Sequence, residues 1–190
     1  MADHFTENAQ LERLDFNDTA LERGVYEECK FVSCIFPASS LKKQVFIDCI
    51  FEDCNLSNTV LAKTSFQSCV FRNCKMVGIQ FENCAPVLLS FSFENCLLNL
   101  SSFRDIKLPG TNFRNCNLQE ADFTGASLPG SSFQGTDLFG AIFSNTILEE
   151  CDFRKAENYS IDPEKNSIQR ARFSLQGIHG LLEKHKIRID

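Results

Sequence analysis

The most regular feature of the sequence is a large apolar residue at every fifth position. The series runs from Leu11 to Phe81, slips by two residues, and resumes from Leu88 to Phe153. A period of five fits neither the 3.6-residue turn of an α-helix nor the two-residue repeat of a strand. A small residue, most often Cys, Ser, Thr or Ala, stands two positions before each large one. We therefore expect short extended pieces separated by tight turns, with one large and one small side chain pointing inward in each repeat.

The position two residues after each large apolar residue is rich in Gly and Asn, which tolerate the positive φ that a type II turn requires. This position is occupied by Asp53, Asn58, Asn73, Gly78, Asn83, Asn95, Gly110, Asn115, Gly125, Gly130, Gly135, Gly140 and Asn145. The pattern predicts a chain that turns a corner every five residues and stacks on itself.

A longer period shows how many repeats make one coil. Every fourth repeat has Phe at its centre: Phe31, Phe51, Phe71, Phe93, Phe113, Phe133 and Phe153. The next residue alternates in charge along Glu52, Arg72, Glu94 and Arg114. Opposite charges on neighbouring strands stabilise a sheet by about 0.2–1 kcal/mol per pair, whereas like charges repel. The alternation predicts a coil of about twenty residues, stacked at the ~4.8 Å spacing of paired strands.

The cysteines follow the same long period. Cys34, Cys54, Cys74, Cys96 and Cys116 occupy the small inward position, and the step from Cys74 to Cys96 contains the same two-residue slip. The slip predicts an insertion within residues 82–92. A structural zinc site needs four ligands that converge on one ion, whereas these thiols form a line. Because Cys also behaves as a small buried apolar residue, we favour packing over metal binding and expect no cofactor.

Residues 121–125 (ADFTG) and 136–140 (TDLFG) match a motif of a small residue, Asp or Asn, Leu or Phe, a polar residue and Gly. Over residues 11–156 the chain resembles the pentapeptide-repeat proteins. The resemblance implies an all-β fold, a right-handed quadrilateral β-helix with four repeats per coil. About seven coils at ~4.8 Å give a rod of about 34 Å. Residues 1–10 are expected to be a polar N-terminal segment.

Residues 157–190 are expected to form a C-terminal cap, with a short amphipathic helix at about 175–185 and a brief strand at 187–189. The segment is similar to the tail of the quinolone-resistance pentapeptide proteins, which dimerise end to end through it. The resemblance implies a homodimer, with the predicted contact made by Leu175, Ile178, Leu181, Leu182, Ile187 and Ile189. The alternative is a cap that only covers the last coil.

Charge and hydropathy limit the function classes. The 190 residues carry a net charge of −6, which disfavours direct binding of nucleic acid. The sequence contains no run of 18 apolar residues, so no membrane span is expected, and its polar first residues do not resemble a signal peptide. We therefore expect a cytoplasmic protein whose cysteines are free thiols.

No sequence motif predicts catalysis. The three histidines, His4, His179 and His185, lie at no motif spacing, and the glycines are explained by the turns. We therefore expect a non-enzymatic protein that works through its outer surface. The resemblance implies an acidic rod that binds DNA gyrase or topoisomerase IV as a mimic of B-DNA. The alternative is an interaction scaffold with an unrelated partner, with outward apolar residues as candidate contacts: Ile50, Val70, Phe139, Ile142 and Ile147.

Overall fold

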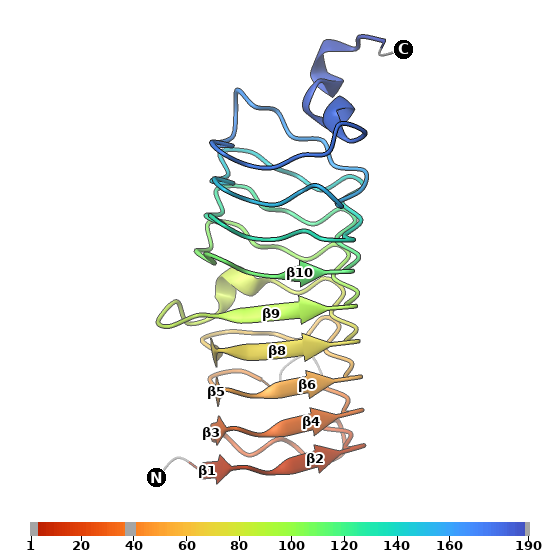
Figure 1. Cartoon of the computed structure of the whole chain (residues 1–190). Helices are drawn as coiled ribbons and strands as arrows, with labels where there is room; N and C mark the ends of the chain where they lie inside the picture. Colours follow the sequence, from red (N-terminus) through yellow and green to blue (C-terminus); the bar gives the residue numbers. More distant parts are fainter. Residues whose placement is uncertain (1–3, 37–40, 189–190) are drawn as a thin grey trace.

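The computed structural model describes residues 4–36 and 41–188, and it shows a rod with the two termini at opposite ends (Figure 1). The strands are β1 (His4–Glu7), β2 (Gln10–Glu12), β3 (Gly24–Glu27), β4 (Lys30–Val32), β5 (Val45–Ile47), β6 (Ile50–Glu52), β7 (Ser65–Gln67), β8 (Cys69–Arg72), β9 (Phe91–Glu94) and β10 (Phe113–Arg114). Three short 3₁₀-helices complete the list: η1 (Phe81–Asn83), η2 (Ile178–Leu181) and η3 (Glu183–His185).

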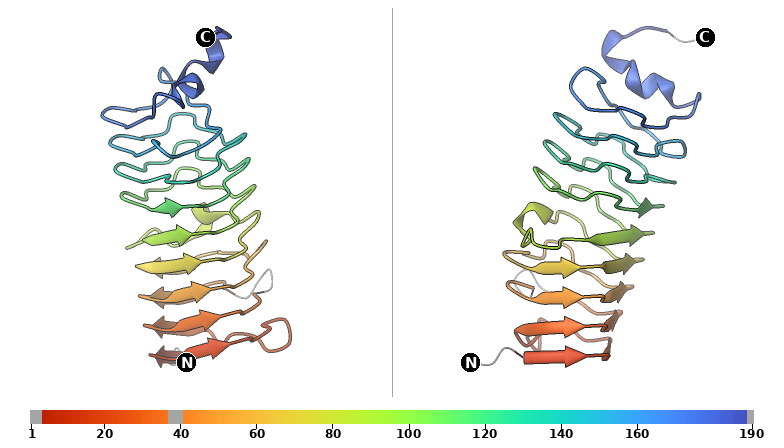
Figure 2. Two further views of the ribbon diagram at one scale, coloured as in Figure 1. Left: turned by 45° about the vertical axis from the view of Figure 1, so that its right-hand side comes forward. Right: turned by 60° about the vertical axis from the view of Figure 1, so that its left-hand side comes forward.

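The strands stack in parallel with a twenty-residue register. One sheet has the order β1-β3-β5-β7 and the other the order β10-β9-β8-β6-β4-β2. Isolated parallel bridges form two further columns, for example Ile35 with Asn55 and Asp122 with Ile142. Four columns of pairing surround the chain axis, so the fold is an all-β solenoid, and Figure 2 shows the same stack from two other sides.

Phenylalanine rings fill the interior of the solenoid. Phe31 and Phe51 are paired in register and their ring centroids lie 4.8 Å apart, with the planes only 6° from parallel. Phe46 meets Phe51 edge to face at 5.2 Å within the same coil. Such ring pairs contribute about 0.5–1.5 kcal/mol each beyond the area they bury. The core of the described coils therefore contains a column of stacked aromatic rings along the axis of the rod.

The corner residues have the backbone conformation that the sequence predicts. Asn73, Asn95 and Asn115 have φ of 52°, 53° and 51°. Their side-chain amides form a chain of hydrogen bonds along the corner, from Asn115 Nδ2 to Asn95 Oδ1 (3.2 Å) and from Asn95 Nδ2 to Asn73 Oδ1 (3.1 Å). The next coil has Gly135 at this corner (φ 68°), where the side-chain oxygen of Asn115 occupies the space of a Cβ. Asn83 is an exception and lies in η1.

The two-residue insertion changes one predicted core position. The resumed repeat places Leu88 inside, but Leu88 has φ 55° and its side chain is 72% exposed. Hydrogen bonds from Ala85 N to Thr64 O and from Ser90 N to Phe66 O hold the two ends of the segment to the preceding coil. The residues between them bulge outward, and Phe91 takes the inward position at 4% exposure.

Both ends of the repeat extend beyond the predicted bounds of 11–156. Residues 4–7, expected in a polar N-terminal segment, form β1, in which Thr6 pairs with Tyr26. A polar residue at the central position hides this repeat in the sequence. At the other end the pairing continues beyond residue 156, where Asp152 pairs with Arg172. The Phe153 and Phe173 rings stack at 5.3 Å, so residues up to 173 continue the solenoid.

Candidate interaction surfaces

The predicted charge ladder lies on the outer face of the six-stranded sheet. Glu52 pairs with Arg72, and Arg72 with Glu94, in the strand register. The ion pairs only partly follow that register: Arg72 and Arg114 both contact Glu94, at 3.6 and 3.4 Å, whereas the carboxylate of Glu52 bonds Lys30 of the preceding coil at 2.5 Å. The hydrogen bond from Lys30 lowers the pKa of Glu52.

Lys30 was missed in the sequence because it belongs to the neighbouring outward column. Its side chain reaches diagonally across the sheet to Glu52, a contact that a comparison of equivalent positions does not detect. These pairs are exposed, so each contributes little stability. Their main effect is to neutralise this face of the rod.

The predicted Phe and Cys columns both lie inside. All seven Phe residues are at most 1% exposed. The five cysteines of the predicted column are buried free thiols, and Cys74 donates hydrogen bonds to the carbonyls of Phe51 and Arg72. Burial raises the pKa of the thiols of Cys49 and Cys151 to about 12. The thiols therefore act as small packing groups that satisfy backbone carbonyls.

Within residues 4–36 and 41–188, no group of three or more His, Cys, Asp or Glu side chains is arranged to hold a metal ion.

The C-terminal segment leaves the last coil and stands at the end of the rod (Figure 2). The single helix predicted at 175–185 is wrong: the segment forms the short 3₁₀-helices η2 and η3. Gly177 and Gly180 lower its helix propensity and let it pack on Tyr159. A Cβ at Gly180 would lie 2.2 Å from the Tyr159 carbonyl oxygen. Residues 187 and 188 are not a strand, and Ile189 lies outside the described residues.

Two polar contacts fasten this segment to the loop before it. The backbone N–H of Ile161 donates to the carbonyl of Gly180 at 2.9 Å. Lys184 Nζ lies 2.7 Å from both Asp162 Oδ1 and Glu164 Oε2. The hydrogen bond from Lys184 lowers the pKa of Asp162. The segment is therefore held in one orientation at the end of the rod.

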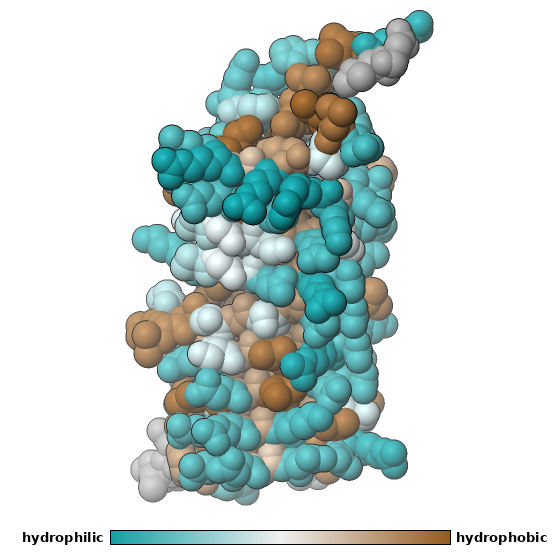
Figure 3. Space-filling model, viewed as in Figure 1, coloured by the Kyte–Doolittle hydropathy of each residue, from teal (hydrophilic) through white to brown (hydrophobic). Residues whose placement is uncertain are grey.

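Five of the six predicted dimer residues lie among the described residues, and they divide into two groups. Leu181 packs against the core and Leu182 is half-buried, so both serve mainly to attach the segment. Leu175, Ile178 and Ile187 are 81%, 40% and 57% exposed. In Figure 3 apolar residues gather where this segment leaves the rod. Of the predicted contact residues that the structure describes, these three have side chains that a partner could reach.

A second apolar feature is the bulge of the insertion, which was missed because Leu88 was assigned to the core. Val87 and Leu88 are 69% and 72% exposed. They belong to the loop that precedes β9 and extends from the side of the rod (Figure 1). Of the outward apolar residues that the sequence indicates, Phe139, Ile142 and Ile147 are exposed, whereas Ile50 and Val70 are half-buried within the sheet face.

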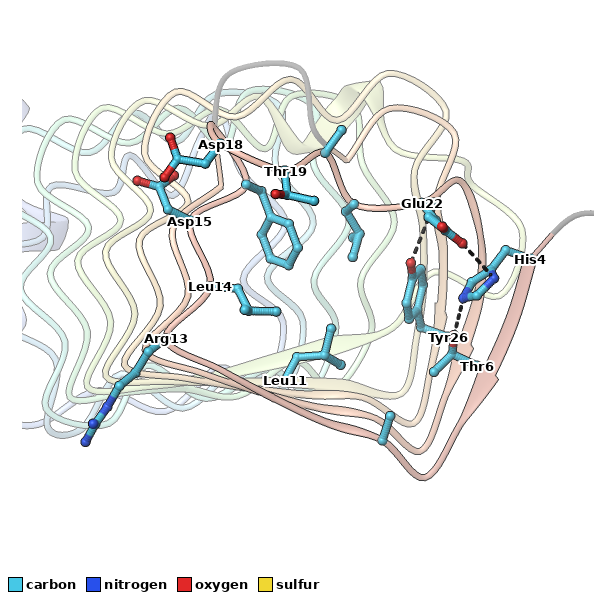
Figure 4. A pocket seen from close by; sticks show the side chains of 14 residues that line it. His4, Thr6, Leu11, Arg13, Leu14, Asp15, Asp18, Thr19, Glu22 and Tyr26 are labelled. Atoms are coloured by element: carbon cyan, nitrogen blue, oxygen red, sulfur yellow. Dashed lines mark hydrogen bonds and ion pairs between the residues drawn. The ribbon is translucent and has the colours of Figure 1, made fainter.

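Among the described residues, no coil covers the N-terminal end of the rod, which was not predicted as a site. Apolar and charged side chains of the first coil together line a hollow of about 570 Å³, and Figure 4 shows Leu11 and Leu14 within the opening. Leu14 occupies the inward position where later coils have Cys34 and Cys54, a substitution that the sequence does show. At the rim, His4 Nδ1 lies 2.9 Å from Glu22 Oε2, and the Tyr26 hydroxyl donates to the Glu22 carbonyl at 2.7 Å.

No helix within residues 4–36 and 41–188 has both the length and the apolar character needed to cross a bilayer.

Solved structures with this fold include two trypsin-treated forms of QnrB1, described as a plasmid-mediated fluoroquinolone resistance protein. One has a TM-score of 0.67 at 20% identity, covering 100% of this chain and 92% of QnrB1. The other has a TM-score of 0.66 at 18% identity, covering 98% and 100%. At these identities the likeness shows the fold alone. HetL of the cyanobacterium Nostoc also matches, with a TM-score of 0.38 at 16% identity, over 93% of this chain and 87% of HetL.

Among curated proteins no sequence matches this chain significantly. Two family models do match it. The pentapeptide repeat region matches residues 25–86, and pentapeptide repeats, in eight copies, match residues 116–154. Together they cover more than half of the sequence, in the segments where the twenty-residue stacking is observed. The chain therefore belongs to the pentapeptide-repeat proteins.

Proposed function

We propose that this chain is a non-enzymatic binding protein whose acidic rod occupies the DNA-binding surface of a type II topoisomerase, DNA gyrase or topoisomerase IV, as a mimic of B-DNA. The observation that carries the proposal is the match to QnrB1, a fluoroquinolone resistance protein, over the whole of this chain. The match includes the C-terminal segment as well as the repeats. Solenoids of this family share a fold without sharing a partner, so the proposal depends on a direct assay.

Dimerisation through the C-terminal segment sets the length of the proposed DNA mimic. The stacked residues 4–173 make about eight coils and a rod of about 40 Å, so two rods joined end to end make about 80 Å. We propose that Leu175, Ile178 and Ile187 form the contact between the two copies, because they are the exposed apolar side chains of a segment held rigidly by Tyr159 and Lys184.

The charge of the proposed dimer is modest for a DNA mimic. Two copies carry 2 × −6 = −12. An 80 Å length of B-DNA carries about 47 negative charges, at one per ~1.7 Å. The charge ladder is also partly neutral, because each Arg lies beside a Glu. We therefore place the acidic contact on other faces, where Glu120 and Glu157 are exposed.

The low charge, together with the exposed bulge, supports a second candidate function. Val87 and Leu88 offer an apolar contact on the side of the rod, away from both ends. An apolar contact of this kind suits an interaction scaffold with an unrelated protein partner, and its binding would tolerate salt. The two functions differ in their response to ionic strength.

The deciding experiment is the supercoiling reaction of purified bacterial DNA gyrase, with and without a quinolone. The topoisomerase proposal predicts that micromolar protein inhibits supercoiling or relieves quinolone poisoning, and that the effect weakens steeply as salt rises. A double variant, Glu120→Lys with Glu157→Lys, should reduce the effect, while Glu120→Gln with Glu157→Gln should reduce it less. An unchanged reaction with and without the drug would remove this proposal and favour the scaffold.

A further inference from the structure

We propose that the N-terminal end of the rod binds an extended peptide, in which apolar residues alternate with Lys or Arg, as an additional strand on the edge of β2. The site lies at the opposite end from the C-terminal segment (Figure 1), so the proposal is independent of both the dimer contact and the topoisomerase.

The first element of the site is an unpaired sheet edge. β2 ends the six-stranded sheet, and within residues 4–36 and 41–188 no strand pairs with its outer side. The edge of a sheet presents backbone N–H and C=O groups that can pair with another chain. Peptides that bind in this way take their affinity from main-chain hydrogen bonds and their specificity from alternate side chains.

The second element is an apolar floor inside the first coil. Phe16 and Leu21 wall the hollow and are only 6% and 9% exposed, so the coil is packed although one side is open. Leu14 crosses the opening with its side chain 42% exposed (Figure 4). A strand placed over β2 would set one inward side chain above Leu11, as Leu11 is set against Phe31. That side chain must be apolar.

The third element is the acidic rim, which selects the charge of the peptide. The outward positions of β2 are Gln10 and Glu12. The hollow beside them is lined by three acidic side chains, Asp15, Asp18 and Glu22, against the single arginine Arg13, so the rim is acidic on balance. A Lys or Arg next to Glu12 would repeat the pairing that Lys30 and Glu52 make further along the sheet. The same rim disfavours a second N-terminal end as the occupant, because the two acidic ends would repel.

The test uses the full chain and a fluorescently labelled eight-residue peptide of alternating lysine and valine, with binding followed by anisotropy at low and at high salt. We expect saturable binding that weakens as salt rises. A peptide of the same composition with the lysines and valines in separate blocks should bind more weakly. A peptide with proline at its centre should also lose affinity, because proline cannot donate to the edge.

Matched variants locate the site. Leu14→Lys places a cation in the opening and should weaken binding by at least about tenfold, as loss of a central apolar contact does. Leu97→Lys is the control, since Leu97 is similarly exposed, at 46%, on the side of the rod. Glu12→Lys should weaken binding several-fold. Equal affinity for all variants, or no binding of the alternating peptide, would overturn the proposal.

Sedimentation of the unliganded chain tests another occupant of the same end. Assembly beyond a dimer that disappears in Leu14→Lys would mean that a second copy of this chain occupies the opening, and the peptide proposal would fail. Assembly that is the same in the wild type and in Leu14→Lys, together with peptide binding lost in that variant, supports the proposal.

Discussion

At the scale of the residue, the Phe at the centre of a repeat contributes to several contacts at once. Phe133 stacks on Phe113 and Phe153, at 5.0 and 4.6 Å, and meets Phe123 and Phe143 edge to face. Its side chain is fully buried. Truncation would remove one neighbour from each of four rings, in a core that cannot collapse because backbone hydrogen bonds fix the distance between coils.

Phe133→Ala should therefore lower the free energy of unfolding by about 3–5 kcal/mol, which urea denaturation can measure. Phe139→Ala is the matched control, since Phe139 is 63% exposed, and it should change stability by less than about 0.5 kcal/mol. Similar losses for the two variants would mean that the aromatic column does not dominate stability.

The inward and corner positions were predictable from the sequence because each depends on local chemistry. A large residue recurs where the chain points inward, and Asn or Gly recurs where φ is positive. The pattern fails where the end of the rod or a backbone bulge, and not the packing of a coil, decides the position of a side chain. Thr6 occupies a central position at the end of the rod, where little core remains to fill, and Leu88 lies in a bulge fixed by hydrogen bonds on either side.

At the scale of the element, the C-terminal segment is the part that sequence periodicity describes least well. Its apolar spacing predicts a helix, but the backbone instead follows the surface of Tyr159, which a helix with side chains at 177 and 180 could not approach. The partner that shapes it is distant in sequence and is not part of any repeat. The predicted apolar residues are nevertheless the ones that contact the core or remain exposed.

The attachment of this segment should depend on pH through Asp162. Its pKa is lowered in the folded protein by the hydrogen bond from Lys184, so the contact stabilises the segment above the unfolded pKa, about 3.9. That stabilisation is lost as the pH falls through the lower folded value. An NMR titration of the Asp162 carboxyl should show the lowered pKa, and Lys184→Ala should return it toward 3.9.

Lys186→Ala is the control for that titration, because Lys186 is exposed and forms no ion pair among the described residues. It should leave the pKa of Asp162 unchanged. An Asp162 pKa that is the same in the wild type and in Lys184→Ala would show that Lys184 does not hold the segment.

At the scale of the whole molecule, the two ends of the rod differ in character. The N-terminal end is an open coil with an acidic rim, whereas the C-terminal end is covered by a segment that carries Lys184, Lys186 and Arg188. The open end was not predicted because a repeat pattern describes what each coil shares and not where stacking stops. The proposed dimer contact and the proposed peptide site therefore use different ends of the rod, and a substitution in one should leave the other unchanged.

The dimer contact can be tested without deleting the cap. Leu175→Lys changes a side chain that is 81% exposed, so folding should be unaffected while self-association weakens by at least about tenfold. Sedimentation equilibrium measures the change. Leu88→Lys, at 72% exposure on the bulge, should leave the association constant as it is. A wild-type chain that sediments as a monomer at all concentrations would remove the dimer.

The register of twenty residues has a consequence for how such a chain can change in length. Each coil pairs only with the coils above and below it, through equivalent positions such as Phe113 and Phe93. Removing residues 113–132 would join Asn112 to Phe133 and reproduce the junction that each coil already has with the next. That shortened chain should fold, as cooperative melting would show, whereas a deletion of eighteen residues should not. Duplication or loss of whole coils could therefore adjust the reach of this protein while leaving both of its ends intact.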